Sequence, residues 1–172
     1  MSEAVSERLG AGRRFPDLDL PDHTGRARRL SELAGGDPLA LLFSRGWWCP
    51  KEQRHLREVT ALQDEFEVAY ARIVVVSIDS SEVQAAFRAG LGARFTFLSD
   101  PDRVWLDRLG LLEERDTLHR PYRPTAFTLR PDLVIHAAYD GYWYWGRPTV
   151  EDLRRDMRAI SRDVRADFRV YE

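Results

Sequence analysis

The sequence predicts a single α/β domain in which a mixed β-sheet carries helices on both faces. Two short, continuous apolar runs, at 38–43 and 73–78, are typical of strands that are covered on both sides. Stretches with helical spacing of apolar residues follow each run. The chain has 172 residues, of which 44% are hydrophobic, and this length fits one domain with its own core.

The N-terminal part of the chain predicts little regular structure before residue 15. Residues 1–14 are polar and charged, and we expect a loose arm there. Apolar residues alternate from Phe15 to Leu20 and a turn rich in Pro, Asp and Gly follows, which predicts an edge strand and a hairpin. Residues 28–33 predict a short helical turn that ends at the following glycines.

The middle of the chain alternates between predicted strands and helices. After the strand at 38–43, residues 44–49 form a loop, and Pro50 opens a helix whose apolar spacing continues to Ala69. The strand at 73–78 is followed by a helix capped by Ser80 or Ser81. A short strand at 95–98 then leads into a helix that starts at Asp100-Pro101 and ends at Gly110.

The last third of the chain predicts two antiparallel strands and a final helix. The strands, at 124–129 and 133–139, are joined by a turn at Arg130-Pro131-Asp132. Thr149 caps the closing amphipathic helix. The order of elements outlines a thioredoxin-like three-layer sandwich, with a mixed central sheet, an N-terminal hairpin and one helical insertion after Ile78. We expect the domain to span 15–165, followed by a C-terminal tail at 166–172.

Composition argues against several classes of partner. There are 26 basic and 28 acidic residues, so the net charge of -2 offers no attraction for nucleic acid or an anionic membrane. No apolar run approaches the roughly 18 residues of a membrane helix, and the N-terminus has no apolar signal segment. Because one cysteine cannot form an internal disulfide, we expect a cytoplasmic protein.

The single cysteine, Cys49, is the strongest candidate for chemistry. Pro50 is favoured in the first turn of a helix, which places Cys49 at the N-cap. The helix dipole and unpaired backbone amides there favour thiolate over thiol, and the thiolate is the nucleophile. Arg45 and Lys51 add positive charge nearby. The alternative, a small buried hydrophobic cysteine, fits this position less well than a mid-strand or mid-helix one.

Several segments together resemble a known family. They are Phe15-Pro-Asp-Leu-Asp-Leu-Pro-Asp22, Leu42-Phe-Ser-Arg-Gly-Trp-Trp-Cys-Pro50, Val75-Val-Ser-Ile-Asp79, Phe97-Leu-Ser-Asp-Pro101 and Arg123-Pro-Thr-Ala-Phe127. Through them residues 11–146 resemble a peroxiredoxin-like redoxin of the alkyl hydroperoxide reductase/thiol-specific antioxidant superfamily. The resemblance implies that Cys49 attacks a hydroperoxide substrate and becomes a sulfenic acid. An external thiol or a thioredoxin-like reductant then restores the cysteine, without a cofactor.

The sequence departs from the family pattern at two places. Typical members carry Pro and Thr seven and three residues before the cysteine, where this chain has Leu42 and Gly46. The dithiol oxidoreductases, the other branch of the thioredoxin fold, carry a second cysteine three residues after the first, where this chain has Glu52, so a dithiol cycle within one chain is excluded. Glu52 would also oppose thiolate formation if it approached the sulfur. A redox-sensing or protein-binding module with little peroxidase turnover is therefore the alternative function.

The resemblance also implies further site residues. It makes Pro124 a cis-proline beside the cysteine and points Arg123 toward the sulfur, where its guanidinium would favour thiolate and bind the departing oxygen. The alternative for Arg123 is a surface position. Gly46 is expected to provide an unusual backbone conformation or room for close approach. The predicted catalytic residues are thus Cys49 and Arg123, and the predicted substrate-binding residues are Arg45, Gly46, Trp48, Pro50 and Pro124.

Aromatic and histidine residues complete the list of candidates. Trp47 and Trp48 predict either walls of a small apolar pocket or core packing. The four histidines lack metal-ligand spacing, so we expect no metal, and His55 is expected on a helix face. The aromatic run at 139–148 fits equally well a packed lid over the sheet edge and the contact surface of a homodimer.

Overall fold

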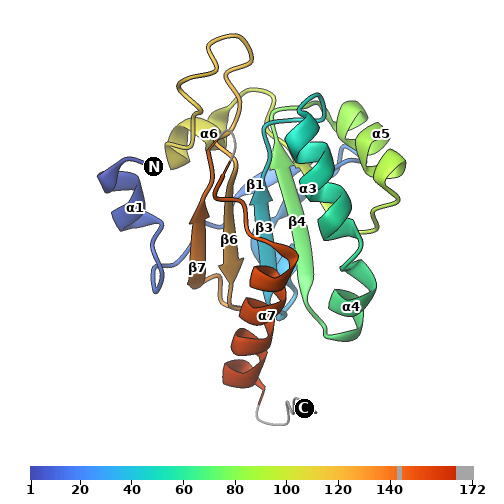
Figure 1. Ribbon diagram of the computed structural model, residues 1–172, viewed down its shortest axis with the longest axis vertical. Coiled ribbons are helices and arrows are strands. Elements are labelled where there is room, and N and C mark those ends of the chain that lie inside the picture. The colour runs from blue at the N-terminus through green and yellow to red at the C-terminus, as the bar shows by residue number, and fades with distance from the viewer. Residues whose placement is uncertain (143–144, 166–172) are drawn as a thin grey trace.

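A five-stranded mixed sheet forms the centre of the molecule (Figure 1). The computed structural model describes residues 1–142 and 145–165, so the predicted tail at 166–172 lies outside the described residues. The strands follow the order β5-β4-β3-β6-β7; the first three are parallel and the last two antiparallel, as predicted. Their bounds are β3 (Leu39–Phe43), β4 (Arg72–Ser77), β5 (Thr96–Ser99), β6 (Thr125–Leu129) and β7 (Ile135–Asp140).

The central strand β3 shows how the sheet divides the core into two halves. Side chains alternate along a strand, so Leu39, Leu41 and Phe43 enter one apolar cluster while Ala40 and Leu42 enter the other. All five are buried, which explains the continuous apolar run in the sequence. The predicted three-layer sandwich is therefore confirmed.

The two faces of the sheet are covered by different elements. The first face packs against α1 (Glu3–Arg8), the antiparallel hairpin β1 (Asp19–Pro21) and β2 (Ala27–Arg29), α2 (Leu30–Ala34) and α6 (Val104–Leu109). The second packs against α3 (Pro50–Thr60), α4 (Gln63–Val68), α5 (Ser81–Leu91) and α7 (Val150–Val164). The predicted N-terminal hairpin is present, and Thr149 caps α7 together with Asp152 in a capping box.

The N-terminal residues are more ordered than predicted. Instead of a loose arm, residues 1–14 contain α1, in which Val5 is buried against the core, as is Leu9 directly after the helix. The terminal ammonium pairs with Asp140 at the end of β7. The segment is short and mostly polar, so besides its N-cap at Ser2 the helix depends on the surface onto which it packs.

The helix predicted to continue to Ala69 is two helices. It breaks after Thr60, whose hydroxyl donates a hydrogen bond to the Leu56 carbonyl at 2.6 Å. Such side-chain bonds compete with regular helix geometry and bend helices. Leu62 and Phe66 are buried beyond the break. The helical spacing of apolar residues therefore continues past Thr60, although the first helix ends there.

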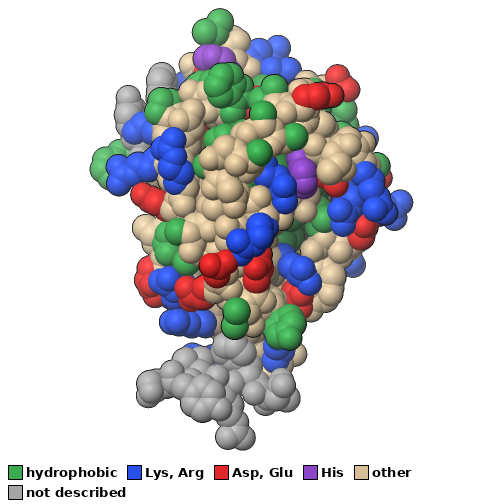
Figure 2. Space-filling model, turned by 90° about the vertical axis from the view of Figure 1, so that its right-hand side faces the viewer, with side chains coloured by type: hydrophobic (Ala, Val, Ile, Leu, Met, Phe, Trp, Pro, Cys, Tyr) green, Lys and Arg blue, Asp and Glu red, His purple; other side chains and the backbone are tan. Residues whose placement is uncertain are grey.

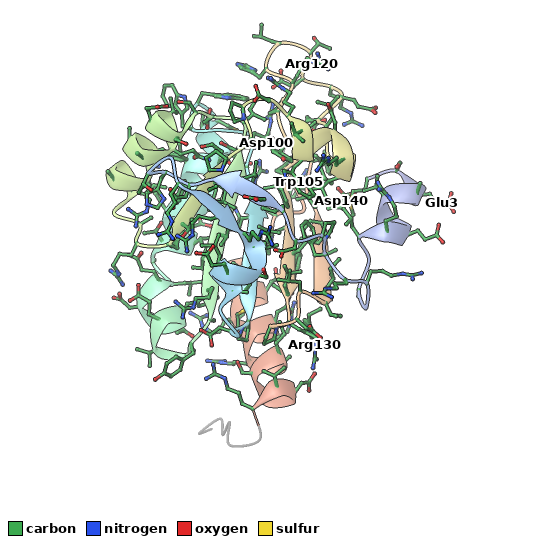
Figure 3. All side chains as sticks on the ribbon, turned by 180° about the vertical axis from the view of Figure 1, so that it is seen from behind. Glu3, Asp100, Trp105, Arg120, Arg130 and Asp140 are labelled. Carbon is green, nitrogen blue, oxygen red and sulfur yellow. The ribbon has the colours of Figure 1, made fainter. Side chains whose placement is uncertain are left out.

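Asp100 fixes the start of α6 and the base of the segment that follows it. Its carboxylate accepts hydrogen bonds from the backbone amides of Val104, Trp105 and Leu106, at 3.0, 3.0 and 2.9 Å. The helix therefore begins after Asp100 rather than at it. The Tyr122 hydroxyl donates to the same carboxylate at 2.6 Å, and burial together with this bond raises the pKa of Tyr122. Figure 3 labels Asp100 close to Trp105.

The surface shown in Figure 2 carries basic and acidic side chains interspersed rather than as a patch of one sign. Ion pairs between helices account for part of this pattern, including Arg154 of α7 with Glu65 of α4 at 2.8 Å. The helices of the described residues include none with the length and apolar character that a membrane crossing requires.

We expect Asp100→Ala to lower the free energy of unfolding by about 2–4 kcal/mol, because three amides and the Tyr122 hydroxyl lose a buried acceptor. Urea unfolding measures the change. The exposed neighbour Asp102, changed to Ala, is the matched control and should stay within about 0.5 kcal/mol of wild type. Equal losses in the two variants would contradict this role of Asp100.

Candidate active site

Cys49 lies where the central strand passes into α3. β3 ends at Phe43, a loop follows, and Cys49 is the N-cap of α3 with Pro50 in the first turn. The Cys49 amide donates to the Gly46 carbonyl at 3.2 Å, and the Cys49 carbonyl accepts from Gln53 at 3.0 Å. The N-cap position is therefore as predicted. The residue is 3% exposed.

The charge beside the sulfur comes from an arginine rather than from the helix amides. No side-chain capping bond joins Cys49 to the first turn of α3, so the expected amide contacts to the sulfur are absent there. Pro50 removes one of the nearest donors. Instead Arg45 Nη1 lies 4.0 Å from Cys49 Sγ. An opposite charge at this distance favours the thiolate.

Arg45 is held on two further sides. Its Nη2 donates to Asp116 Oδ2 at 2.6 Å, and the two side chains are only 4% and 9% exposed. Its guanidinium carbon lies 5.1 Å from the centre of the Trp48 ring, in cation–π contact. Arg45, which the sequence predicted both as positive charge near Cys49 and as a substrate-binding residue, is thus the cation next to the sulfur.

Asp116 and His119 belong to the site but were not predicted. Asp116 Oδ1 accepts from the His119 backbone amide at 3.0 Å, and the His119 Nδ1 atom lies 3.1 Å from both carboxylate oxygens. The His119 ring stacks on Trp48, with centres 3.8 Å apart and planes 14° apart. Asp is common in turns, but this signal does not reveal which cation the carboxylate binds.

A hollow of about 470 Å³ opens beside the sulfur. It gives the buried Cys49 a route to solvent. Its lining brings together four predicted site residues, the neighbouring Lys51 and five residues of the segment 111–123. They are Arg45, Trp48, Cys49 and Pro50, then Lys51, then Arg115, Asp116, Thr117, Leu118 and His119.

Three of the predicted site residues, Gly46, Arg123 and Pro124, do not line this hollow. Arg123 donates from Nε to Asp140 Oδ1 at 2.5 Å. Asp140 is paired with Thr125, the first residue of β6, in the sheet register. Its carboxylate therefore lies beside the Arg123 guanidinium. The expected cis bond at Pro124 is wrong as well, because no peptide bond of the described residues is cis.

Gly46 has both properties expected of it. Its φ of +133° is unfavourable for other residues, and a Cβ atom built there would lie 2.7 Å from Trp48 Nε1. A threonine, the usual family residue at this place, would therefore collide with the indole. The next amide, that of Trp47, donates to Asp79 Oδ2 at 3.0 Å, and burial raises the pKa of Asp79.

The two tryptophans have different surroundings. Trp48 forms a wall of the hollow, between Arg45 and His119. Trp47 is 49% exposed and is not core packing. The apolar wall predicted from the pair therefore comes from Trp48.

Glu52 is neutralised by a buried ion pair on the side of α3 behind the sulfur. Arg147 donates to Glu52 Oε1 from Nε at 3.0 Å and also from Nη2. One turn later, His55 Nε2 lies 2.9 Å from the Pro148 carbonyl, and burial lowers the pKa of His55. Because Arg147 balances its charge, Glu52 does not act on Cys49 as an isolated carboxylate.

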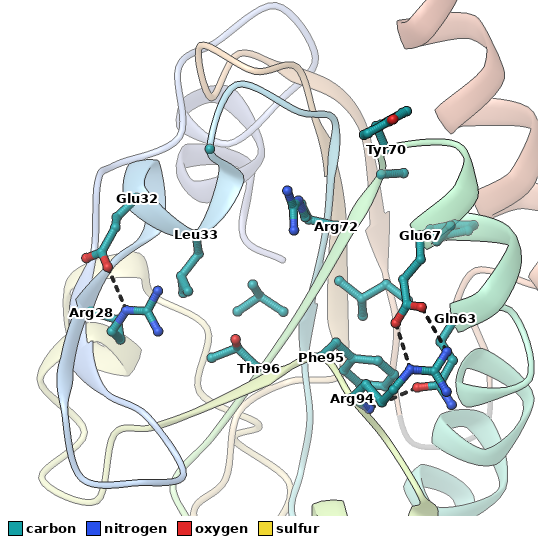
Figure 4. Close-up of a pocket in the computed structure, with 15 residues that line it drawn as sticks. Arg28, Glu32, Leu33, Gln63, Glu67, Tyr70, Arg72, Arg94, Phe95 and Thr96 are labelled. Atoms are coloured by element: carbon teal, nitrogen blue, oxygen red, sulfur yellow. Dashed lines mark hydrogen bonds and ion pairs between the residues drawn. The ribbon is translucent and has the colours of Figure 1, made fainter.

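A second hollow, of about 480 Å³, lies at the opposite end of the sheet (Figure 4). It is lined by residues near the starts of β4 and β5, whereas Cys49 follows the end of the parallel strand β3. Its charged side chains form pairs, such as Arg28 with Glu32 at 2.9 Å and Arg94 with Glu67 at 2.8 Å. It contains no nucleophile to compare with Cys49. No group of three metal-binding side chains occurs in the part of the chain described.

We expect Arg147→Met to lower the free energy of unfolding by about 3–5 kcal/mol, because it leaves the Glu52 carboxylate buried without its counter-charge. The double variant Glu52→Gln/Arg147→Met should recover most of that loss. Urea unfolding of both proteins measures it. A double variant no more stable than Arg147→Met would show that packing, rather than the uncompensated charge, carries the effect.

Comparison with known proteins identifies the family of the chain. The AhpC/TSA family matches residues 11–138. A protein of Mycobacterium tuberculosis named as a peroxiredoxin is 32% identical over 132 residues, covering 74% of this chain and 82% of its own. A second from that organism is 28% identical over 156 residues, covering 87% of this chain and 96% of its own.

Solved structures show the same fold. Peroxidoxin BcpB from Mycobacterium tuberculosis superposes with a TM-score of 0.75 at 24% identity, covering 91% of this chain and 99% of that one. Reduced Prx3 from Vibrio vulnificus, determined in complex with hydrogen peroxide, gives a TM-score of 0.77 at 19% identity, covering 87% and 99%. Because the family model matches residues 11–138 and the first relative is 32% identical, the chain belongs to the AhpC/TSA family of peroxiredoxin-like, thiol-dependent peroxidases.

Proposed function

We propose that the protein reduces hydroperoxides with Cys49 as its one redox-active residue and Arg45 as the cation that activates it. The thiolate attacks the terminal oxygen of the hydroperoxide. An S–O bond forms, the O–O bond breaks, and the sulfur loses two electrons to become a sulfenic acid. The alkoxide that leaves takes up a proton. The observation that carries this proposal is the Arg45 guanidinium 4.0 Å from Cys49 Sγ, at the floor of an open hollow.

Reduction of the sulfenic acid requires thiols from outside the chain, since Cys49 is its one cysteine. An external thiolate attacks the sulfenic sulfur, forms a mixed disulfide and expels hydroxide, which is protonated to water. A second thiol then attacks the mixed disulfide and releases Cys49 as thiolate. A small thiol or a thioredoxin-like protein fits this role, and the hollow provides the access that either needs.

A redox-sensing or protein-binding module with little turnover is the second candidate. Gly46 favours it, because the φ of +133° and the contact with Trp48 exclude the threonine hydroxyl that assists peroxide binding in typical members. Such a module would form the sulfenic acid or mixed disulfide but cycle slowly. Steady-state turnover with a thiol donor separates the two candidates.

The surroundings of the protein in the cell are part of the same proposal. A single free thiol suits the reducing cytoplasm.

The aromatic run at 139–148 supports a homodimer, since Tyr142 and Trp145 are 39% and 70% exposed and such residues are enriched in interfaces. Residues 143–144 of that run lie outside the described part of the chain.

We expect wild type to consume hydroperoxide in the presence of a thiol donor, and Cys49→Ser to reduce consumption to the background rate. A coupled assay of thiol oxidation measures this. Turnover that survives in Cys49→Ser would contradict the proposal, and sulfenic acid formation without turnover in wild type would favour the sensing module.

We expect Arg45→Met to lower kcat/KM for hydroperoxide roughly tenfold or more at pH 7, because the thiolate loses its neighbouring cation. Arg57→Met, at an exposed position on α3, is the matched control and should behave like wild type. A loss confined to KM, with the pH profile unchanged, would show that Arg45 binds substrate without activating the sulfur.

A further inference from the structure

The segment 111–123 joins α6 to β6 and contributes one side of the active-site hollow. In Figure 1 it projects beyond the carboxyl ends of β3 and β4, and Figure 3 shows Arg120 near its outer end. Its base is fixed by the bond from Tyr122 to Asp100. Toward the sulfur its polar contact is Asp116 with Arg45, and its aromatic contact is His119 with Trp48.

The Asp116 carboxylate is bonded at both oxygens. Oδ2 accepts from Arg45 Nη2 at 2.6 Å, and Oδ1 accepts from the His119 amide at 3.0 Å. Burial alone would raise the pKa of Asp116, but these bonds outweigh it and the pKa lies below its ordinary value of 3.8. The stability that the carboxylate contributes is therefore present above that value and is lost as the pH falls through the lower folded-state pKa.

The planar guanidinium of Arg45 links Asp116 to the sulfur of Cys49. The group is planar and rigid, so a short bond at Nη2 also determines where Nη1 points. Nη2 is fixed by Asp116, and Nη1 is the atom 4.0 Å from Cys49 Sγ. The ring of Trp48, itself stacked on His119, supports the guanidinium from a third side.

From these contacts we propose that Asp116 is a positioning residue, which holds the Arg45 guanidinium against Cys49 and ties the segment 111–123 to the active site. The inference rests on the proposed function in so far as Arg45 activates the sulfur. This positioning role explains why the Asp116 carboxylate lies in the same site as the reactive Cys49 thiolate. Its charge would disfavour the thiolate, whereas its hold on Arg45 favours it.

These two effects of Asp116 have opposite signs, so a substitution separates them. If the carboxylate acts only through its charge, its removal makes the thiolate easier to form. If it positions Arg45, its removal frees the guanidinium to leave the sulfur, and the thiolate becomes harder to form. The direction of the change in Cys49 ionisation decides between the two.

The test is the rate of Cys49 alkylation by iodoacetamide across pH, in wild type, Asp116→Ala and Asp116→Glu. The limiting rate at high pH reports access to the sulfur, and the midpoint of the profile reports thiolate stabilisation. We expect the midpoint of Asp116→Ala to move to higher pH, so that the rate at pH 7, relative to its own limit, falls roughly tenfold. Asp116→Glu should recover most of the shift.

Two comparisons sharpen this result. In Arg45→Met the hold on Arg45 is already lost, so adding Asp116→Ala should not raise the midpoint further and should lower it, because only the repulsion between carboxylate and thiolate remains. Glu114→Gln removes an exposed carboxylate of the same segment and should leave the profile unchanged. A midpoint for Asp116→Ala that is unmoved or moves to lower pH would overturn the inference, as would additive effects of the two substitutions.

Alkylation needs no hydroperoxide, so the inference and the proposed function fail in different ways. Wild type without peroxidase turnover would contradict the proposed function, while an upward shift in Asp116→Ala would still support the positioning role. Turnover in wild type together with an unmoved midpoint would sustain the peroxidase and remove Asp116 from its mechanism. Circular dichroism of each variant confirms that the fold is intact.

Discussion

The active site depends on one electrostatic contact, between the Arg45 guanidinium and the sulfur of Cys49. Both groups are almost fully buried, so the interaction is little weakened by solvent or salt. A buried cation without a partner would be costly, and Asp116 supplies the counter-charge. The sulfur, the guanidinium and the carboxylate therefore form one charged unit at the end of the central strand.

The fold serves this unit by bringing together two segments that are distant in the chain. Cys49 and Arg45 come from the junction of β3 with α3, and Asp116 comes from the segment beyond α6. The junction is held from below by Glu52 with Arg147, and the distant segment by Asp100 with Tyr122. Both supports are buried polar contacts, which specify one arrangement because the alternatives would leave polar groups unsatisfied.

Much of the fold followed from local patterns in the sequence. The apolar run of β3, the proline after Cys49 and the threonine before α7 each identified an element through a property of a few adjacent residues. The break after Thr60 was missed because the apolar spacing continues across it to Leu62 and Phe66, and helix α1 was missed because its formation depends on the surface onto which it packs. Local pattern does not contain that information.

The site was predictable only where its residues adjoin Cys49. Arg45, Trp48 and Pro50 lie within a few positions of it and do line the hollow. Arg123 was assigned to the sulfur from the resemblance alone, and Asp140 binds it instead. Asp116 and His119 carried no signal, since their role depends on the path of a segment without a regular pattern. In this chain the cation near the sulfur comes from the loop before the cysteine.

The most direct measurement is mass spectrometry of the Cys49 peptide after the reduced protein meets one equivalent of hydroperoxide in the presence of dimedone. We expect a dimedone adduct on Cys49 that forms quickly at pH 7 in wild type and much more slowly in Arg45→Met. An unmodified Cys49 in wild type, or equal rates in the two proteins, would contradict the claim that this guanidinium activates this sulfur.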